Sequence, residues 1–455
     1  MGASLHALKS QEVMKKSLVF ILILVMLASF AFIVQAHEEP PLGSLADSGK
    51  MILIHLDSGT IIDQLRADEP HAPASTVKMM TFLVAYEILS DRMDEIVATN
   101  EPAVNVGGTR MGLLLGENIT IRNLFGAMIL SGANDAAVML AYASFPGEAF
   151  PIAAFVERMN ERATELGMSS TNYTNVTGLD DIVFMRTTAR DVSIIATHLH
   201  TNSFFMSFAG QAFITIPASN LNAARRVNNR NYLVPGSSIH PTHGVSGTNG
   251  MNAGMTGAAG LCLVATIVIN NNTFLVVILG AQSDDRVPGG FDCHRIASDL
   301  LTWAEQNFSY RIILDHTTIL GEILVRFSAS SDTIIIVPRG SVSMFMSNSV
   351  NISEDFTTRV EIYETDLIAP VARDTVVGVV YVYHLGEEIA SLELVTRSSL
   401  HLNRWHMFTA GVFRVVNSGW FWLVIILIAV ICTAYVLLNA RIKYIKDQRS
   451  QIIIK

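Results

Sequence analysis

The sequence predicts an α+β domain, then a smaller all-β domain and a C-terminal transmembrane helix, and three observations support this architecture. Residues 40–307 mix helical apolar periodicity with long apolar strand segments, which favours helices packed around an antiparallel sheet. Beyond residue 310 the pattern changes to short alternating runs separated by Gly- or Pro-containing turns. Residues 420–438 are a nearly unbroken apolar segment of membrane-spanning length.

The N-terminal segment is typical of an exported protein. Lys15 and Lys16 precede an apolar run over residues 18–34, and small residues follow it before a polar stretch. We therefore interpret residues 1–36 as a signal peptide or, if it is not cleaved, as an N-terminal hydrophobic anchor.

Residues 37–307 are predicted to form the first domain. Its antiparallel sheet combines a short N-terminal strand pair with a later apolar hairpin, and a helical cluster lies between them in sequence. Asn134 and Asp135 follow an interruption in the helical pattern and are expected to cap the next helix. The elements expected, in chain order, are strands at 51–55 and 61–62, helices at 73–88, 121–130, 136–142 and 155–166, and a hairpin at 261–279.

Residues 310–400 are predicted to form the second domain, in which every expected element is a strand. The segment holds no constellation of His, Cys and carboxylate side chains that suggests a chemical site, so a spacer or docking role is expected. Its expected strands are residues 322–327, 333–337, 357–363, 376–383 and 389–395.

Residues 418–440 are predicted to cross the cell membrane as a single C-terminal span. Trp420 and Trp422 lie at one edge of the apolar segment, and basic residues follow its other edge. By the positive-inside rule, residues 441–455 form a cytoplasmic basic tail, and the bulk of the chain is then extracytoplasmic.

Charge and cysteine content exclude several kinds of partner. The formal net charge of −9 and the shortage of basic clusters argue against a nucleic-acid partner. Cys432 falls within the predicted span, which leaves at most one disulfide, between Cys262 and Cys293. No spacing resembles a zinc site, so neither a metal nor another cofactor is expected.

The predicted chemistry lies at the start of the helix expected over residues 73–88. Ser75 and Lys78, at positions i and i+3, share one helix face, where a desolvated neutral lysine can take the proton of a serine nucleophile. The N–H groups of the first helical turn would face the negative charge that develops. Lys78 is the only lysine between Lys50 and Lys443, which favours a role that needs an amine able to lose its proton.

Taken together, these stretches resemble the serine D-alanyl-D-alanine carboxypeptidases, which are low-molecular-mass penicillin-binding proteins. The resemblance covers nearly the whole chain, including the trailing β-domain and the C-terminal membrane anchor. It implies a domain with the penicillin-recognising serine transferase fold that β-lactamases and DD-peptidases share. The matching stretches are the strand and turn to Gly59, Pro73–Thr81, Asn134–Ala137, Phe155–Asn160, Leu166–Met168, Thr177–Leu179, Thr187–Asp191 and Thr256–Gly260.

The resemblance implies an acyl-transfer cycle on peptidoglycan stem peptides that end in D-Ala-D-Ala. Ser75 would attack the D-Ala-D-Ala bond with Lys78 as base, D-alanine would leave, and water would clear the acyl-enzyme. Asn134 would bind the substrate's amide backbone, and the backbone amides of Ser75 and Met255 would form the oxyanion site. β-Lactams would acylate the same serine.

Two of the family's three motifs are degraded in this chain. In the Ser-x-Asn motif, Gly132 occupies the serine position, and in the Lys-Thr-Gly motif the corresponding residues are Asn252, Ala253 and Gly254. An alternative register over residues 242–244, Thr-His-Gly, would supply a cation but abandons the downstream match. The missing groups would bind the terminal carboxylate and pass a proton to the leaving amine, and each is worth ~3 kcal/mol, or about a hundredfold in rate.

Three functions remain open from the sequence. The first is a carboxypeptidase of full or reduced activity that depends on Ser75, Lys78 and Asn134. The second is a catalytically impaired peptidoglycan-binding or regulatory protein on the same fold, which the loss of the motif residues favours. The third is a β-lactamase, which the extra β-domain, the anchor and the lack of an evident deacylating glutamate segment disfavour.

Overall fold

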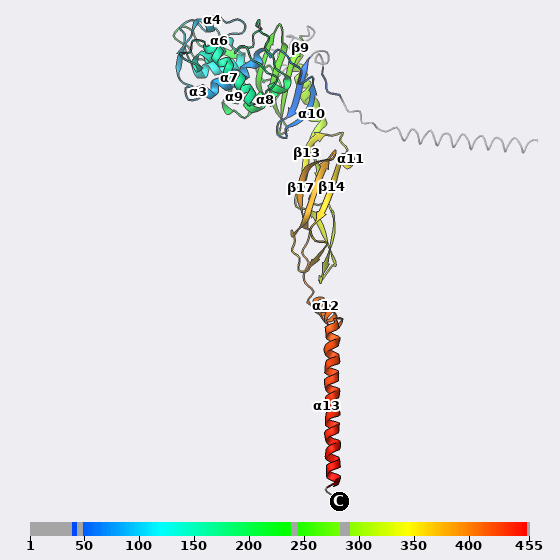
Figure 1. Cartoon of the computed structure of the whole chain (residues 1–455). Helices are drawn as coiled ribbons and strands as arrows, with labels where there is room; N and C mark the ends of the chain where they lie inside the picture. The colour runs from blue at the N-terminus through cyan, green and yellow to red at the C-terminus, as the bar shows by residue number, and fades with distance from the viewer. Residues whose placement is uncertain (1–38, 43–48, 238–243, 283–291, 453–455) are drawn as a thin grey trace, which may run out of the picture. The chain divides into compact units, whose positions relative to one another are not determined.

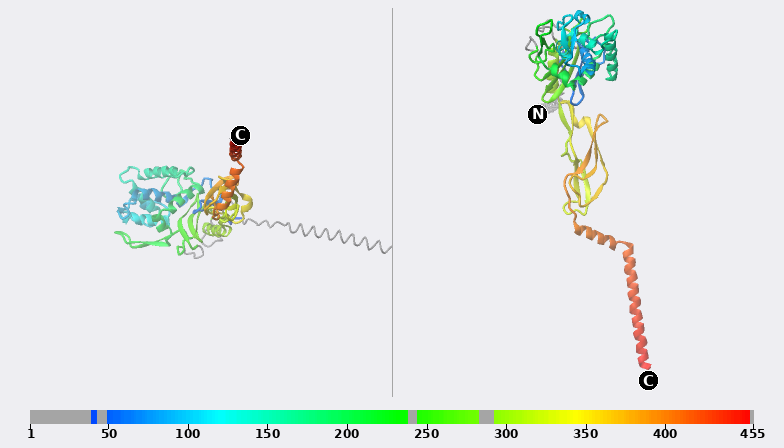
Figure 2. Two further views of the ribbon diagram at one scale, coloured as in Figure 1. Left: turned by 90° about the horizontal axis from the view of Figure 1, so that it is seen from below. Right: turned by 90° about the vertical axis from the view of Figure 1, so that its left-hand side faces the viewer.

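The computed structural model describes residues 39–42, 49–237, 244–282 and 292–452. It divides into two compact units, drawn in Figures 1 and 2. The first contains the described residues up to Tyr310 together with Phe345–Ser349, and the second contains the rest. The segment interpreted as a signal peptide, residues 1–36, lies outside the described residues.

The first unit is built on a five-stranded antiparallel sheet with the strand order β2-β1-β9-β8-β7. The hairpin expected over residues 261–279 is present as β8 and β9, and Asn270 and Asn271 take positive φ at its turn. Strand β7 lies at one edge of the sheet. The strands are β1 (Lys50–His55), β2 (Thr60–Leu65), β7 (Thr248–Thr256), β8 (Gly260–Ile269) and β9 (Asn272–Ala281).

The two faces of this sheet bury different helices. Alternate residues of β8 belong to different apolar cores, so that Val264 packs with the helical cluster while Leu263 and Ala265 pack with α10 (Asp292–Asn307). Figure 1 shows the helical cluster and α10 beside the sheet strands. Because both faces are covered, β8 is apolar along almost its whole length.

The helical cluster forms the larger apolar core of the unit. At its centre, Phe82 and Phe125 meet edge to face with ring centroids 5.3 Å apart, and both are fully buried. Two short antiparallel strand pairs, β3–β4 and β5–β6, border the cluster. The elements are α3 (Val77–Leu89), α4 (Glu101–Asn105), α5 (Ile121–Ser131), α6 (Asn134–Ser144), α7 (Pro151–Glu165), α8 (Ala189–His200), α9 (Ser203–Ala209), β3 (Ile96–Ala98), β4 (Asn118–Thr120), β5 (Phe213–Ile216) and β6 (Arg225–Asn228).

The helix expected to begin at Pro73 begins differently. A single 3₁₀ turn, η1 (Ala74–Thr76), precedes α3, and Ala74 has a φ of 47°. A Cβ added at Gly178 would lie 1.8 Å from the Ala74 carbonyl oxygen, so another loop passes directly against this turn. The prediction that Pro73 starts a continuous α-helix is therefore wrong, because the backbone around Ala74 adapts to this tertiary contact.

The break expected near residues 131–135 is present, but the predicted cap is wrong. Gly132 ends α5 with a φ of 67°, and its N–H donates to the Met128 carbonyl at 3.1 Å. The N-cap of α6 is Ala133, which offers no side-chain cap. Asp135 instead accepts the backbone N–H groups of the loop at Met111 and Gly112, at 3.0 and 2.9 Å.

The second unit contains a six-stranded sheet with the order β14-β16-β17-β12-β11-β15. Its pairs are antiparallel except for the parallel pair β11–β15. Strands β10 and β13 form a separate two-stranded pair. Strands β10 (Phe308–Leu314) and β13 (Val342–Ser347) each have residues in both units. The other elements of the second unit are β11 (Gly321–Arg326), β12 (Thr333–Pro338), α11 (Ile352–Asp355), β14 (Phe356–Ile362), β15 (Asp366–Ile368), β16 (Val376–His384) and β17 (Glu387–Thr396).

Two helices end the described chain, the amphipathic α12 (Arg404–Val416) and the long α13 (Gly419–Ile452). Figure 2 shows α13 as a continuous helix after the shorter α12. Within the described residues, Gly419–Lys446 is the one helical segment long and apolar enough to cross a membrane. The span expected over residues 418–440 falls almost entirely within it.

Candidate active site

Ser75 and Lys78 lie together at the start of α3. The Lys78 Nζ is 3.0 Å from the Ser75 Oγ, so the two groups are within hydrogen-bond reach. Only 2% of Lys78 is exposed, whereas Ser75 is half-buried at the wall of a pocket of about 340 Å³. The hydroxyl can therefore meet a ligand while the amine stays out of water.

Burial gives Lys78 the protonation state that a general base needs. Removal from water disfavours the ammonium form, and the nearby Arg230 guanidinium adds repulsion, so the pKa of Lys78 falls to about 7. A substantial fraction of Lys78 is therefore neutral at physiological pH. In that form the nitrogen carries a lone pair that can accept the Ser75 proton.

The loop at Thr177 orients the lysine. The Lys78 Nζ donates to the Thr177 carbonyl at 2.5 Å, which leaves its lone pair free to face Ser75. The Asn175 side chain holds this loop by accepting from the N–H groups of Thr177 and Gly178 at 3.0 and 2.8 Å. Because Gly178 has a φ of 79° and no side chain, the loop can approach the turn that carries Ser75.

The edge strand β7 passes directly beside the serine. A Cβ added at Gly254 would lie 2.5 Å from the Ser75 Cβ and 2.8 Å from its Oγ, so only glycine fits here. Strand β7 thereby contributes Ala253, Gly254 and Met255 to the lining of the serine pocket, while Asn252 precedes them in the strand. The alternative register places Thr242 and His243 outside the described residues.

The β7 residues that replace Lys and Thr offer little to an anion. Asn252 is only 4% exposed, and its Oδ1 has no hydrogen-bond partner within the described residues. Ala253 and Gly254 line the pocket without side-chain donors, and Met255 beyond them is 66% exposed. None of these side chains can supply the positive charge that a lysine would.

Gly132 also faces the serine. A Cβ added there would lie 3.7 Å from the Ser75 Oγ, so a side chain at this position would point at the nucleophile. The hydroxyl of the adjacent Ser131 lines the pocket but donates to the Ala127 carbonyl at 2.9 Å within its own helix. Gly132 therefore places no hydroxyl beside the Ser75 Oγ.

Asn134 lies behind the pocket wall rather than in the wall itself. It is 3% exposed, and its Nδ2 donates to the Gly107 carbonyl at 2.8 Å. A Cβ added at Gly108, which lines the pocket, would come within 2.7 Å of that same Nδ2. The amide thus supports the loop that faces Ser75, and its contact with substrate remains a prediction.

The structure adds a cation that the sequence analysis missed. Arg230 lines the serine pocket, and its guanidinium donates to the Thr109 hydroxyl. Its backbone N–H donates to the Leu130 carbonyl at 2.9 Å, which fixes the segment against the end of α5. Arg230 follows Asn229 and precedes Asn231 in a segment without a predicted element, so nothing in the spacing linked it to Ser75.

Cys262 is a second potential nucleophile in the pocket wall. Burial raises the pKa of its thiol to about 12, despite a hydrogen bond from the Gly280 backbone, so the thiolate is not populated near neutral pH. Both Cys262 and Cys293 are free thiols, so the disulfide considered between them is not formed.

A serine beside a buried lysine of lowered pKa, placed on an α+β fold at the edge of an antiparallel sheet, is the arrangement expected of a serine hydrolase. Residues 34–283 match the family of D-alanyl-D-alanine carboxypeptidases known as peptidase S11. The chain belongs to this family.

Curated relatives share this similarity over much of their length. The D-alanyl-D-alanine carboxypeptidase DacF of Bacillus subtilis is 30% identical over 275 residues, which are 59% of this chain and 67% of that protein. DacA of Haemophilus influenzae, another D-alanyl-D-alanine carboxypeptidase, is 28% identical over 392 residues, or 82% of this chain and 88% of that protein.

A solved structure extends the likeness to the fold. Penicillin-binding protein 5 of Haemophilus influenzae superposes with a TM-score of 0.52 at 25% identity, over 77% of this chain and 97% of that one. The fold is therefore that of penicillin-binding protein 5, as the resemblance implied.

Proposed function

We propose that the protein is a membrane-anchored serine D-alanyl-D-alanine carboxypeptidase-like enzyme that acts on peptidoglycan stem peptides through a Ser75 acyl-enzyme. The observation that carries the proposal is the 3.0 Å contact between the Ser75 Oγ and a Lys78 amine whose pKa is about 7. A structural lysine gains nothing from such burial, whereas a general base depends on it.

The proposed reaction has two steps. The Ser75 Oγ bonds to the carbonyl carbon of the penultimate residue as its proton passes to Lys78, and the C–N bond then breaks as the leaving amine takes that proton. Water next attacks the Ser75 ester with Lys78 again as base, which releases the shortened peptide and restores the hydroxyl. The backbone N–H groups of Ser75 and Met255 are proposed to bind the oxyanion.

Arg230 is proposed to bind the terminal carboxylate of the substrate. It is the guanidinium in the wall of the serine pocket, a wall that also includes Ala253, which provides neither charge nor hydroxyl. A planar guanidinium is well suited to a carboxylate. This residue would offset part of the loss caused by the degraded motif.

Catalysis is proposed to be slow because two polar contributions are missing. Without a hydroxyl at Gly132 the leaving amine lacks a local proton relay, and without a lysine at Asn252 the pocket carries less positive charge. The effects of residues that act together are not additive, so the deficit is smaller than the sum of single losses.

The second candidate function is a catalytically impaired protein that binds peptidoglycan or regulates its processing. The side chains at Gly132, Asn252 and Ala253 favour it, because each lacks the functional group of the intact motif. Such a protein would bind stem peptides at the same pocket without turnover.

Release of D-alanine from an N-acylated pentapeptide mimic distinguishes the two candidates. The carboxypeptidase releases D-alanine in the wild-type chain and none in Ser75→Ala. The binding protein gives saturable binding of the same peptide with no release from either. Turnover of nitrocefin at a rate far above peptide hydrolysis would instead assign a β-lactamase.

A further inference from the structure

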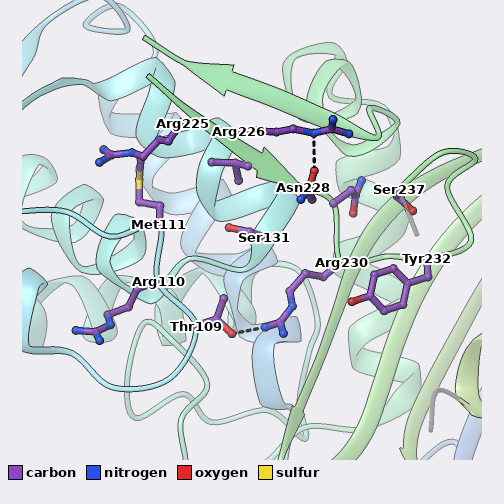
Figure 3. A pocket seen from close by; sticks show the side chains of 12 residues that line it. Thr109, Arg110, Met111, Ser131, Arg225, Arg226, Asn228, Arg230, Tyr232 and Ser237 are labelled. Atoms are coloured by element: carbon purple, nitrogen blue, oxygen red, sulfur yellow. Dashed lines mark hydrogen bonds between the residues drawn. The ribbon is translucent and has the colours of Figure 1, made fainter. Parts of the chain in front are cut away.

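The serine pocket continues past Arg230 into a second pocket of about 330 Å³, shown in Figure 3. Thr109, Ser131, Arg230 and Tyr232 line both pockets, so the two pockets adjoin. The second pocket lies between the loop that carries Arg110 and the strand β6, and it contains none of the residues to which we assign acylation.

This second pocket is strongly basic in a chain whose formal net charge is −9. Four arginines and no acidic residue line it, namely Arg110, Arg225, Arg226 and Arg230. Figure 3 shows Arg230 directed towards Thr109 and Arg226 directed towards Asn228, while the ends of Arg110 and Arg225 extend away from Ser131. Basic side chains that gather in an otherwise acidic protein indicate a site for anions.

Among the four arginines, Arg225 is the one that pairs with a described acid, the buried Glu117 carboxylate, at 2.7 Å. Arg110 donates to the Val104 carbonyl at 3.0 Å, and Arg226 donates to the Asn228 Oδ1 at 2.8 Å. Within the described ranges, neither of these two guanidinium groups forms an ion pair, so no described carboxylate neutralises their charge.

Contacts within the protein restrain two of the arginines of the second pocket. The Arg226 guanidinium lies over the Phe213 ring at 3.6 Å from its centroid, which restrains a long side chain by stacking. Glu117 ties the start of β6 to the neighbouring loop, because it also accepts from Asn222 at 2.7 Å. Preorganised cations lose little entropy when they bind an anion.

We assign the second pocket to the leaving-group side of the proposed reaction, because Arg230, the proposed partner of the terminal carboxylate, lines both pockets. On this assignment, atoms of a leaving residue that extend past the terminal carboxylate would enter the second pocket.

We propose that this pocket selects substrates whose leaving residue is an acidic D-amino acid, which carries a second carboxylate in its side chain. This inference rests on the proposed function, since it names the leaving group of the same reaction. The bonds made and broken are the same as in the proposed carboxypeptidase reaction. The difference lies in the amine that departs from the acyl carbon.

Two N-acylated peptides that differ only in the leaving residue test the proposal, one ending in D-Ala-D-Glu and the other in D-Ala-D-Gln. Binding is measured to the full-length Ser75→Ala chain in detergent, with its fold checked by circular dichroism, so that no turnover is required. The D-Glu peptide should bind about fivefold to tenfold more tightly at low salt, and the ratio should fall as salt rises. In wild type, the ratio of kcat/KM values should favour D-Glu in the same way.

Variants identify the charges responsible. Arg226→Gln and Arg110→Gln should each bring the D-Glu to D-Gln ratio towards one. Arg122→Gln is the matched control, because this arginine pairs with Asp94 on an exposed surface outside the pocket, and it should leave the ratio unchanged.

Equal affinity for the two peptides would overturn the inference, whether or not wild type cleaves either of them. A clear D-Glu preference in binding would support it even if no peptide were hydrolysed. Absence of hydrolysis bears only on the proposed function, so the two failures are distinguishable.

Discussion

Lys78 is the residue whose environment decides the chemistry of this protein. An amine that is almost fully buried, with an arginine nearby and a carbonyl to hold it, is poised to exchange a proton near pH 7. Ser75 lies in the 3₁₀ turn η1 and Lys78 in the first turn of α3, so their proximity depends on short-range geometry together with the Gly178 loop that packs against Ala74.

The rate of Ser75 acylation is expected to rise with pH and level off above about pH 7. In the proposed mechanism neutral Lys78 is the base. Its pKa is about 7, and below this value each pH unit protonates about nine-tenths of the remaining base. Stopped-flow acylation by a fluorescent penicillin, followed from pH 5 to 9, measures the profile.

Arg230→Gln should shift this midpoint to higher pH. Burial remains the main cause of the lowered pKa, but the repulsion from the guanidinium is gone. Arg122→Gln, a charge change on the exposed surface, is the control and should not move the midpoint. An acylation rate independent of pH between 5 and 9 would remove Lys78 as the base.

At the scale of residues, the sequence identified the pair but not its surroundings. Ser75 and Lys78 could be found because spacing along a helix and the rarity of lysine are properties of the sequence itself. Arg230 could not be found, because its proximity to the pair depends on how a segment without regular structure crosses the end of α5.

The element that completes the site is β7, the edge strand that lies against η1. Because Gly254 leaves no space for a side chain beside Ser75, the strand can approach closely enough to form one wall of the pocket. The site is therefore a contact between two elements that are distant in sequence.

Gly254→Ala is expected to lower the acylation rate by at least about a hundredfold. The new methyl group would lie 2.5 Å from the Ser75 Cβ and must displace either the strand or the serine, and a misplacement of 1 Å costs about this much. Labelling by a fluorescent penicillin measures the loss.

Gly257→Ala is the matched control, since the nearest atom to its added Cβ would be 3.6 Å away, at Asp180 Oδ2. It should label at the wild-type rate. If Gly254→Ala also did so, β7 could not lie against the serine in the active form.

Restoring the motif should increase activity. Gly132→Ser, Asn252→Lys and Ala253→Thr together supply a hydroxyl near the leaving amine and a carboxylate-binding pair, and we expect D-alanine release to rise at least about tenfold. The left-handed φ of 67° at Gly132 will cost some stability. Steady-state release from a pentapeptide mimic measures the gain, and no gain would mean that these positions do not act on the leaving group.

At the scale of elements, apolar periodicity predicted the apolar helices and the β8–β9 hairpin. Most residues of these elements are buried, so their sequences are strongly apolar. The same pattern did not predict where the helices begin. Pro73 and Asn134 carry the local signals of a helix start and cap, but tertiary contacts with Gly178 and Gly107 determine the actual geometry. Short pairs such as β5–β6 were also missed, because they bury too little to show a period.

At the scale of the whole molecule, the chain combines a peptidase-family domain, a β-rich unit and an apolar helix. We propose that α13 anchors the protein in the cell membrane with the basic tail in the cytoplasm and the bulk of the chain outside. The apolar segment Gly419–Lys446 supports a span, and the cationic residues near its end support the orientation.

This topology predicts the outcome of protease treatment. In intact spheroplasts, external protease should digest the units before α13 and leave an epitope at the C-terminus protected, whereas lysis should expose that epitope. Removal of residues 418–455 should move the remainder to the soluble fraction. Digestion of the C-terminal epitope in intact spheroplasts would contradict the orientation.

The central claim is that Ser75 is a nucleophile activated by Lys78, and covalent labelling by a β-lactam tests it most directly. Intact-mass spectrometry of the purified chain after incubation with benzylpenicillin should show one adduct, located on the peptide that contains Ser75. The adduct should be absent in Ser75→Ala and strongly reduced in Lys78→Met. A folded wild-type chain that acquires no adduct after prolonged exposure to excess β-lactam would contradict the account.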